Sequence, residues 1–571
     1  MLKRPRVVLI YPPPWCMAPE GTPQPTGMPF GAPTDDPDPD LSGDAEIMTY
    51  GLLTIAAEAR RAGYEVRIIN AFRMRWPQVE ALIAACDAEV FGISAFTVNR
   101  RGLAAVARLI REKHPAAHIT AGGPFVTALP RETLQHMPEI DSVVIGEGET
   151  TFLELLECLG QGRSVAGLAG TGWRDASGPR LGPPRPRIDH LETLASPFDY
   201  FTSPIVMTSR GCPSKCTFCG SFTTWGRKLR FLPVETCVEL FSRALSRLPL
   251  PFLLIKDDTF TADRRRAMAI CDAIIERGLH FVWSCDSRVD SVDDALLHKM
   301  RLAGCQLISF GVESGSPEIL GRIGKRTTPE MVLEATRAAR RYGIHVRYYM
   351  MMGNRGETPE TLQESVELIR AGRPDTYLFS ALSLYPGTEE WTLFKAGGQA
   401  DDSLFFNSDF FELSVLNQRK AAGDHVLLHL QCAVGQPNGF EPTLEERAEV
   451  VARIPQHAMA HAELARACYK AGRFDEALQA LDAAAALDCP VPFVLDNLRA
   501  CIALAQGEVD AALRQMEDNA QRHGLPSLTD NLQRLRHWAA LPAGLRGAPP
   551  RLNDFVLVSL FVDLSPASLL N

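Results

Sequence analysis

The chain has 571 residues, which is too long for a single hydrophobic core and predicts about three or four domains. Its formal net charge of −9 and pI near 5.9 lack the strong positive field of nucleic-acid-binding or polybasic membrane-binding proteins. Fourteen cysteines scattered along the chain do not resemble a disulfide framework, so we expect reduced thiols and a cytoplasmic location. The first residues lack the apolar core of a signal peptide, and the late apolar run over 554–564 is too short to span a bilayer.

Strand and helix patterns alternate along the N-terminal part of the chain. RVVLIYPP (Arg6 to Pro13) is typical of a buried strand, and YGLLTIAAEARRAG (Tyr50 to Gly63) is typical of an amphipathic helix. Ten prolines between Pro12 and Pro39 predict an irregular loop between them. Continued alternation predicts an α/β fold with a doubly wound parallel sheet over residues 1–165.

Ligands of such sheets bind at the carboxyl ends of the strands. Those ends carry glycine and small polar residues in three loops, at 94–99, 121–124 and 146–149. Glycine lets backbone amides approach a ligand closely, although a tight turn also explains each loop taken alone. Three such loops at one edge predict a ligand site.

The alternation resumes after a segment rich in glycine and proline. Residues 166–202 are expected to form a linker or hairpin, and six further strand patterns follow over 203–400. Six strand–helix units are too few for a closed eight-fold barrel. They predict a partial (β/α)6 barrel with its chemistry at the strand ends.

The loop RGCPSKCTFCG, from Arg210 to Gly220, follows the first of these strands and holds Cys212, Cys216 and Cys219. A structural zinc site uses four protein ligands, and no second pair follows at zinc-finger spacing. A [4Fe–4S] cluster has four irons, so three thiolates would leave one iron open for a small molecule. Three unrelated core cysteines are a poor alternative, because glycine and proline keep this segment a loop.

CPSKCTFC resembles the CxxxCxxC motif of the radical S-adenosylmethionine (SAM) enzymes. Later motifs resemble the cobalamin-binding branch of that superfamily in their order: KDDTF (256–260), SCDSRVD (284–290), GVESGS (311–316) and YPGTE (385–389). The N-terminal sheet is similar to the cobalamin domain of that branch, so the resemblance runs from about Arg6 to Glu390. One departure is GNRGET (353–358), in which Arg355 stands where related sequences often have proline.

The resemblance implies roles for the residues of the barrel. Cys212, Cys216 and Cys219 would bind three irons of the cluster, and SAM would chelate the fourth. Four residues would lie near SAM: Phe218, Arg288, Glu313 and Ser314. Asp258 and Arg288 would be catalytic. Asp257 and Asp258 would orient SAM or the substrate, with N-capping of a helix near 261–264 as the alternative.

The resemblance also implies bound cobalamin. The D-x-H motif that supplies a histidine to cobalt in other cobalamin proteins is absent from this sequence, as is common in the radical branch. Seven residues are candidates for contact with cobalamin: Arg73, Ser94, Thr97, Gly122, Gly123, Glu147 and Gly148. The lower face of cobalt would meet Arg73, Asn99 or the loop 12–15.

The remaining third of the chain differs in pattern. Small and aliphatic residues lie at tetratricopeptide-like positions in AELARACYKAGRFDEALQALDAAAALD (462–488). Gly472, Ala477 and Leu481 recur 35 residues later as Gly507, Ala512 and Met516. This period predicts an α-helical tetratricopeptide-like domain over 446–571 that packs on the barrel, after a connector over 401–445.

The resemblance therefore implies a cobalamin-dependent radical SAM enzyme. It would transfer a methyl group from methylcobalamin to an unactivated carbon of a peptide, carrier-bound or small-metabolite substrate, with SAM as radical source and methyl donor. An electron donor such as flavodoxin or ferredoxin would be its partner, with no nucleic acid and no membrane. Non-radical methyl transfer, ring rearrangement or oxidative cyclisation are alternatives. A cluster- and cobalamin-bearing sensor or scaffold is an alternative of another class. A tRNA methylthiotransferase would usually bring a second cysteine triad and a basic appendage, which the sequence lacks.

Overall fold

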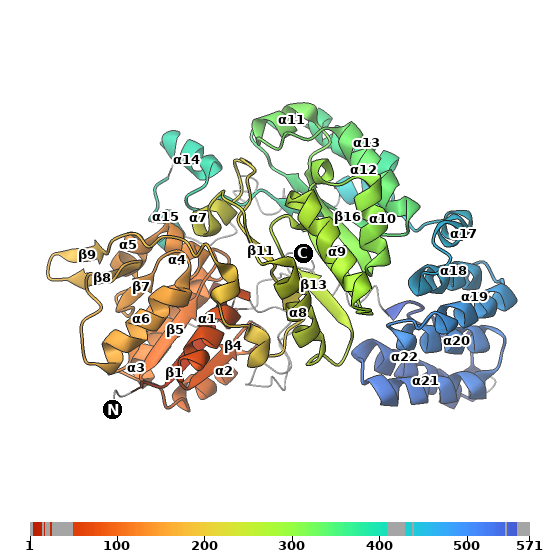
Figure 1. The fold of residues 1–571 in the computed structure, drawn as a ribbon, viewed down its shortest axis with the longest axis horizontal. Coiled ribbons are helices and arrows are strands. Elements are labelled where there is room, and N and C mark those ends of the chain that lie inside the picture. The colour runs from red at the N-terminus through yellow and green to blue at the C-terminus, as the bar shows by residue number, and fades with distance from the viewer. Residues whose placement is uncertain are drawn as a thin grey trace.

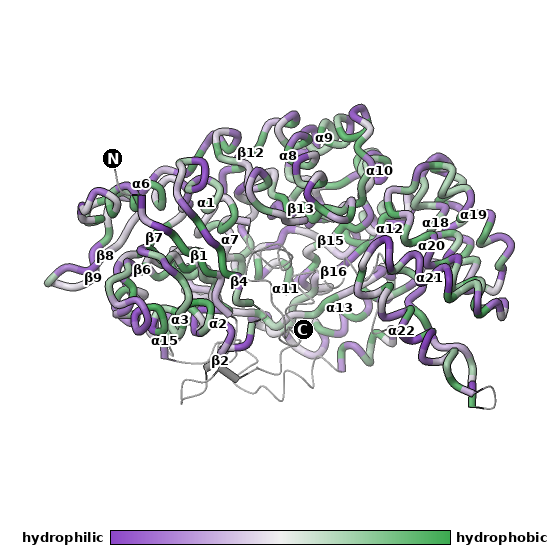
Figure 2. Tube along the Cα trace, turned by 90° about the horizontal axis from the view of Figure 1, so that it is seen from below, coloured by the Kyte–Doolittle hydropathy of each residue, from purple (hydrophilic) through white to green (hydrophobic). Residues whose placement is uncertain are grey.

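The structure, a computed structural model, describes residues 4–13, 16–17, 23–24, 50–72, 74–398, 400–407, 429–436, 439–542 and 545–556. Figure 1 shows three parts in a row: an N-terminal sheet with its helices, a central barrel, and a set of C-terminal helices on the far side of the barrel. Figure 2 shows the same row from below, with hydrophilic residues along the outer turns of the C-terminal helices.

Seven strands form the N-terminal sheet, in the spatial order β4-β1-β5-β6-β7-β8-β9. Their bounds are β1 (Val7–Tyr11), β4 (Val66–Asn70), β5 (Val90–Ser94), β6 (His118–Gly122), β7 (Ser142–Val144), β8 (Thr171–Asp175) and β9 (Gly178–Leu181). The first five are parallel, and their order reverses direction between β1 and β5. Ligands of open α/β sheets bind at such a reversal, outside the carboxyl ends of the strands.

Helices cover both faces of this sheet, as the alternation of β1 requires. Val7, Leu9 and Tyr11 share a core with α1 (Tyr50–Arg61) and α6 (Gly148–Gly160). Val8 and Ile10 share the opposite core with α2 (Trp76–Ala84) and α3 (Arg100–Lys113). Two short helices, α4 (Pro124–Ala128) and α5 (Pro130–His136), also lie on this second face. The predicted doubly wound parallel sheet is confirmed.

The stretch 166–202, expected as a linker or hairpin, contains the hairpin β8–β9. Both strands pair antiparallel and extend the sheet beyond β7. The proline-rich loop lies mostly outside the described residues. Its described backbone pairs β2 (Cys16–Met17) with β3 (Pro23–Gln24).

The barrel is a sheet of six parallel strands in sequential order, which confirms the predicted partial (β/α)6 architecture. The strands are β10 (Ile205–Val206), β13 (Phe252–Ile255), β14 (Val282–Ser287), β15 (Cys305–Glu313), β16 (His345–Met352) and β17 (Thr376–Ala381). A small ladder joins β11 (Ser209–Arg210) to β12 (Arg230–Phe231). The surrounding helices are α7 (Ser221–Trp225), α8 (Val234–Leu245), α9 (Arg264–Glu276), α10 (Asp294–Leu302), α11 (Pro317–Arg322), α12 (Pro329–Arg341) and α13 (Pro359–Gly372).

After β17 the chain returns to the N-terminal sheet, which the sequence pattern does not indicate. Helices α14 (Glu389–Ala396) and α15 (Leu404–Asn407) lie beside that sheet in Figure 1, although they follow the barrel in the chain. Trp391 and Phe405 belong to the core of the sheet's second face. Nε of the buried Arg100 donates to the carbonyl of Phe405 at 2.5 Å. This return fastens the barrel to the sheet.

Six C-terminal helices pack against the amino ends of the barrel strands, as Phe252 and Val282 share one core with them. They are α17 (Leu444–Arg453), α18 (Ala458–Lys470), α19 (Phe474–Ala486), α20 (Pro492–Ala505), α21 (Val509–His523) and α22 (Pro526–Ala540). Within the part of the chain that the structure describes, none of the helices is long and apolar enough to cross a membrane.

Candidate functional site

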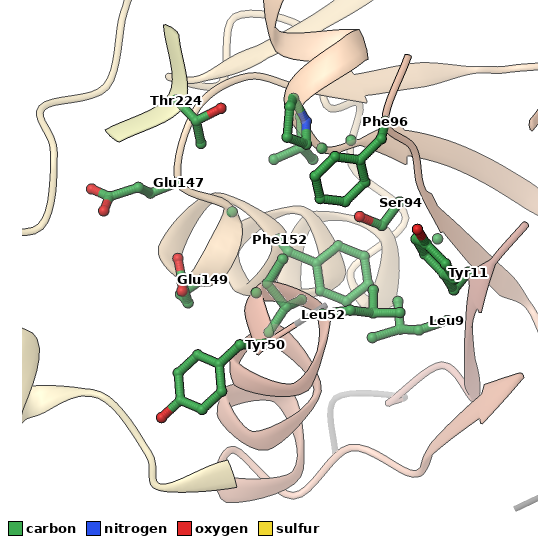
Figure 3. A pocket seen from close by; sticks show the side chains of 18 of the residues that line it. Leu9, Tyr11, Tyr50, Leu52, Ser94, Phe96, Glu147, Glu149, Phe152 and Thr224 are labelled. Carbon is green, nitrogen blue, oxygen red and sulfur yellow. The ribbon is translucent and has the colours of Figure 1, made fainter. Parts of the chain in front are cut away.

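A cavity of about 530 Å³ opens at the carboxyl edge of the N-terminal sheet, where β1 and β5 lie side by side (Figure 3). Aromatic side chains form much of its wall: Tyr11, Tyr50, Phe72, Phe96, Phe152 and Trp225. Five of the predicted cobalamin contacts also line it: Ser94, Gly122, Gly123, Glu147 and Gly148. Thr97 does not. It is buried, and its carbonyl accepts from Arg100. Arg73 lies outside the described residues.

Glycines keep this cavity open. A Cβ added at Gly51 or Gly146 would meet no atom within 4 Å, and both residues line the cavity. Gly123 has φ of 93°, and a Cβ there would lie 2.6 Å from the carbonyl oxygen of Ala95. Only glycine adopts this backbone conformation freely. The loops therefore reach the edge as bare backbone, which suits close approach of a ligand.

Asn99, named above as a candidate for the lower face of cobalt, has another role in the structure. Its side chain is 1% exposed and does not line the cavity. Oδ1 accepts from the amide of Phe96 at 2.7 Å, and Nδ2 donates to the carbonyl of Pro12 at 3.1 Å. Asn99 thus joins the loop after β5 to the loop after β1.

The carboxylates of Glu147 and Glu149 lie on the side of the cavity opposite Ser94 and Tyr11 in Figure 3. Glu147 accepts from Arg210 at 2.9 Å, from Arg230 at 2.8 Å and from the amide of Ile188 at 2.7 Å. Glu149 accepts from Arg210 at 2.5 Å. These carboxylates are therefore engaged between sheet and barrel. Burial would raise the pKa of Glu149, but the charge and hydrogen bonds of Arg210 hold that pKa below its ordinary value.

A second cavity, of about 330 Å³, opens at the carboxyl ends of the barrel strands. Cys212, Cys216 and Cys219 line it as free thiols. Nη1 of Arg288 lies 3.9 Å from the sulfur of Cys216, and Oγ1 of Thr259 lies 3.9 Å from that of Cys212. Burial raises the pKa of the Cys219 thiol to about 11. A ligand that binds thiolate must therefore displace the proton.

Contacts from three other segments fix the cysteine loop. Gly211 has φ of 94°, and a Cβ there would lie 2.4 Å from the carbonyl oxygen of Lys228. The amide of Thr217 donates to the carbonyl of Ile323 at 3.0 Å, and its hydroxyl donates to Glu390 at 2.7 Å. The loop is thus held by backbone packing and by the residues that follow β15 and β17.

The two aspartates after β13 differ in their surroundings. Asp257 is buried and accepts from the amide and hydroxyl of Thr208, both at 2.6 Å, so it fixes the strand before the cysteine loop. Asp258 lines the cysteine cavity and accepts from Ser221 at 2.5 Å. The alternative of helix capping is wrong for both, since Asp263 caps α9 by accepting from the amide of Arg266.

Lys256 and Asp258 line both cavities and so form their common wall. Nζ of Lys256 lies 3.1 Å from Oδ2 of Asp286. Burial would lower the pKa of Lys256, but the carboxylate of Asp286 raises it, so the ammonium keeps its charge. Lys256 lies in the motif KDDTF and Asp286 in the motif SCDSRVD, and neither motif indicates this ion pair. Their pairing depends on the register of β13 and β14, which a linear pattern does not show.

Of the residues expected near SAM, Phe218, Arg288 and Glu313 line the cysteine cavity and Ser314 does not. Glu313 has φ of 69° and pairs with Nζ of Lys325 at 3.0 Å. Ser314 is fully buried, and its hydroxyl accepts from the amide of Ser316 at 3.1 Å. The hydroxyl of Ser314 thus orders the turn after β15.

Two protein-family models match parts of this chain. The model described as "Radical SAM superfamily" matches residues 206–369, and the model described as "B12 binding domain" matches residues 42–156. Among curated proteins, the chain is 32% identical over 354 residues to an uncharacterized methyltransferase of Pyrococcus horikoshii, covering 60% of this chain and 77% of that protein.

Two solved structures have a similar fold. The radical SAM methyltransferase TsrM of Kitasatospora setae, solved with cobalamin and a [4Fe–4S] cluster bound, aligns with a TM-score of 0.54 at 18% identity over 70% of this chain and 76% of that one. The cobalamin-dependent radical enzyme OxsB, solved with aqua-cobalamin and SAM, aligns with a TM-score of 0.53 at 17% identity over 99% of this chain and 84% of that one.

Proposed function

The chain belongs to the family of cobalamin-binding radical SAM methyltransferases, and on that basis we propose that it transfers a methyl group to an unactivated carbon of its substrate. The substrate would be a peptide, a carrier-bound intermediate or a small metabolite. One observation carries this proposal: Lys256 and Asp258 line both the sheet-edge cavity and the cysteine cavity. A substrate bound beside Lys256 and Asp258 would have access to both cavities.

The residues of the cysteine cavity fit a [4Fe–4S] cluster with SAM. Three thiols line one cavity, and thiolates are the usual ligands of such clusters. Oδ1 of Asp286 is buried without a hydrogen-bond partner in the part of the chain described. Such an acceptor suits an amino or hydroxyl donor of SAM. We assign Cys212, Cys216 and Cys219 to the cluster and Phe218, Arg288 and Glu313 to SAM.

The sheet-edge cavity fits the nucleotide tail of cobalamin. Its aromatic wall suits a planar base, and the open space beside Gly51 and Gly146 has no protein atom to fill it. Ser94, Gly122, Gly123 and Gly148 are the residues we assign to this contact. Glu147 is assigned to the wall only, because protein donors already engage its carboxylate.

When bound, the cluster supplies the electron that cleaves SAM, and cobalamin supplies the methyl group. The residues of this chain position the reactants. Ser221 holds the carboxylate of Asp258, and Asp286 holds the ammonium of Lys256, so both side chains face the reaction space in fixed orientations. Burial raises the pKa of Asp258, which favours a proton on it relative to an exposed aspartate. Asp258 would thus orient the substrate by hydrogen bonding.

Turnover of SAM by the reconstituted chain tests this function. The protein is purified without oxygen, supplied with iron, sulfide and hydroxocobalamin, and incubated with SAM, dithionite and candidate substrates. A methyltransferase of this kind forms both S-adenosylhomocysteine and 5′-deoxyadenosine, each in step with methylated product. A sensor or scaffold would bind SAM and form neither. Formation of 5′-deoxyadenosine without S-adenosylhomocysteine would indicate rearrangement or cyclisation instead.

We also propose that the C-terminal helices are tetratricopeptide-like repeats that support the barrel. Gly472 and Gly507 have positive φ, of 73° and 86°, and each lies in the turn between two paired helices. Equivalent turns at one period are typical of stacked helical repeats. The paired helices are α18 with α19 and α20 with α21.

A further inference from the structure

Three exposed cations lie on or beside the cysteine loop, in a protein whose net charge is −9. A small cavity of about 300 Å³ lies there, lined by Lys215 of the loop and by Arg326 of the segment after α11. Arg227 lies at the same loop, where its guanidinium donates to the carbonyl of Ser214. We call Lys215, Arg227 and Arg326 the rim cations, and all three are exposed.

The rim cations differ from the cations deeper in the site. Arg288 pairs with Asp290 at 2.7 Å, and Lys325 pairs with Glu313 at 3.0 Å. In the described part of the chain, no carboxylate forms an ion pair with any rim cation. The inner charges are therefore neutralised within the protein, and the outer charges are left for an external anion.

The backbone of Arg326 has an unusual conformation. Its φ is 59°, in the left-handed region that disfavours residues with a Cβ. Glycine would adopt this conformation without strain. Strained residues persist where the surrounding structure holds them. Here the conformation presents an arginine beside the cysteine loop.

The rim is close to the cysteine sulfurs. Lys215 lies between Cys212 and Cys216 in the chain, and a Cβ on Gly324 would come within 2.8 Å of the carbonyl oxygen of Lys215. Arg288 links the same two segments, as it donates to the carbonyl of Lys325 at 2.7 Å and approaches Cys216. Electron transfer weakens steeply with distance, so a donor at this rim would have a short path to a cluster on these cysteines.

We propose that the rim cations form the docking surface for an acidic, low-potential electron-carrier protein. This inference rests on the assignment of the cluster to Cys212, Cys216 and Cys219. The carrier loses one electron and the cluster gains it, and no atom is transferred. Charge complementarity steers such encounters and raises association rates, and redox encounters of this kind bury little surface.

The test compares a protein donor with a small reductant. The charge-reversal variant Lys215→Glu with Arg326→Glu is measured beside Arg373→Glu, an exposed arginine with φ of 48° at the C-cap of α13. Arg373 precedes β17 and so lies toward the opposite end of the barrel. Iron content and the absorbance of the cluster are checked first. Lys215→Gln with Arg326→Gln replaces the reversal variant if its cluster does not assemble.

Stopped-flow bleaching of the cluster gives the rates. With reduced flavodoxin at low salt we expect the rim variant to be at least about tenfold slower than wild type, and Arg373→Glu to be within about twofold. With dithionite all three proteins should agree within about threefold. Raising the ionic strength should slow the flavodoxin reaction of wild type and leave the rim variant almost unchanged.

Binding is measured separately on the holoprotein with its cluster oxidised, by the anisotropy of labelled oxidised flavodoxin, so the result does not depend on turnover. Equal losses with flavodoxin and dithionite would overturn the proposal, since the rim would then only support the cluster. The proposal would also be overturned if the rim variant and Arg373→Glu lost the same fraction of the rate of cluster reduction by flavodoxin. Unchanged flavodoxin binding with lost binding of an acidic acyl-carrier protein would assign the rim to the substrate instead. Normal rim-dependent reduction without methyl transfer would leave this inference intact and reject the proposed function.

Discussion

Nη2 of Arg210 lies 2.5 Å from Oε1 of Glu149, in an ion pair whose side chains are 4% and 3% exposed. Arg210 ends the strand that leads into the cysteine loop, and Glu149 lies in the first turn of α6 at the sheet edge. The same arginine also pairs with Glu147 at 2.9 Å. Arg210 therefore links the carboxylates at the sheet edge to the strand that leads into the cysteine loop.

Removal of the negative charge of Glu149 should weaken the contact between the sheet and the barrel. Glu149→Gln keeps the size of the side chain but leaves part of the Arg210 charge buried without a partner. We expect the free energy of unfolding to fall by about 3 kcal/mol, as in other broken buried pairs. Denaturant unfolding checks this, with Glu157→Gln on the exposed side of α6 as control, expected within about 0.5 kcal/mol of wild type.

The difference in free energy of unfolding between wild type and Glu149→Gln depends on pH in a definite direction. The folded pKa of Glu149 lies below its ordinary value, so its stabilisation is present above that value, about 4.3, and is lost as pH falls through the folded pKa. The free energies of unfolding of wild type and Glu149→Gln should thus differ by the same amount at pH 8 and at pH 6. A gap that narrows between those two values would contradict the assignment.

His457 should make the C-terminal helices sensitive to mild acid. Its Nε2 lies 2.9 Å from the carbonyl of Arg301, and its Nδ1 accepts from the amide of Ala460 at 3.3 Å, so both partners suit the neutral ring. Burial and the charge of Arg301 lower its pKa to about 3. The pKa of this histidine is higher in the unfolded state, so the free energy of unfolding should decrease once the pH is below that unfolded-state pKa. At pH 5 the decrease should be about 2 kcal/mol.

Hydrogen exchange of α18 at pH 7.5 and pH 5 measures this loss. His457→Asn removes the titrating group and should make exchange, corrected for intrinsic rates, nearly independent of pH over this range. His461→Asn is the control, because that histidine lies one turn further along the same helix and its Nε2 lies 2.8 Å from the carbonyl of Pro455 instead. If His457→Asn retains the full pH dependence, another group is responsible.

Filling the sheet-edge cavity should weaken cobalamin binding without unfolding the protein. Gly51 lies in the first turn of α1 beside open space, so Gly51→Leu adds a side chain to the cavity and improves helix propensity. We expect the dissociation constant for cobalamin to rise at least about tenfold, which corresponds to about 1.4 kcal/mol. Gly321→Leu, in an exposed turn of α11 with equal free space, should bind as wild type does.

Asp258→Asn tests the common wall of the two cavities. The variant should retain its iron, its cobalamin and its affinity for SAM within about threefold, because the amide oxygen of an asparagine can accept the same hydrogen bond from Ser221. Product formation should fall about a hundredfold. Asp272→Asn, on the outer side of α9 where Asp272 pairs with Lys299, should turn over normally. Loss of the cluster in Asp258→Asn would assign it a structural role instead.

Local pattern predicted the elements of this protein well. The alternating faces of β1 and the regular spacing of strands and helices indicated both parallel sheets, and the three cysteines expected to bind the cluster line one cavity. The predicted and observed elements agree because they depend on interactions over a few residues: the side-chain period, the turn chemistry and the spacing of ligands.

Contacts between distant segments were not predictable in the same way. The partners of Arg210 lie more than 60 residues away in the chain, and α14 returns to a sheet that ended 200 residues earlier. Thr97 and Ser314 lie in the predicted loops, yet their backbones place them outside the cavities. Position at a strand end indicates which loop reaches a ligand, and not which side chain of that loop does so.

The most direct test of the central claim needs no known substrate. The reconstituted protein is incubated with SAM that carries a trideuterated methyl group and with reductant, and bound cobalamin is extracted in the dark for mass spectrometry. The account predicts the deuterated methyl group on nearly all of the bound cobalamin, with an equal amount of S-adenosylhomocysteine. Stoichiometric cobalamin that stays unlabelled, while SAM is converted only to 5′-deoxyadenosine, would contradict it.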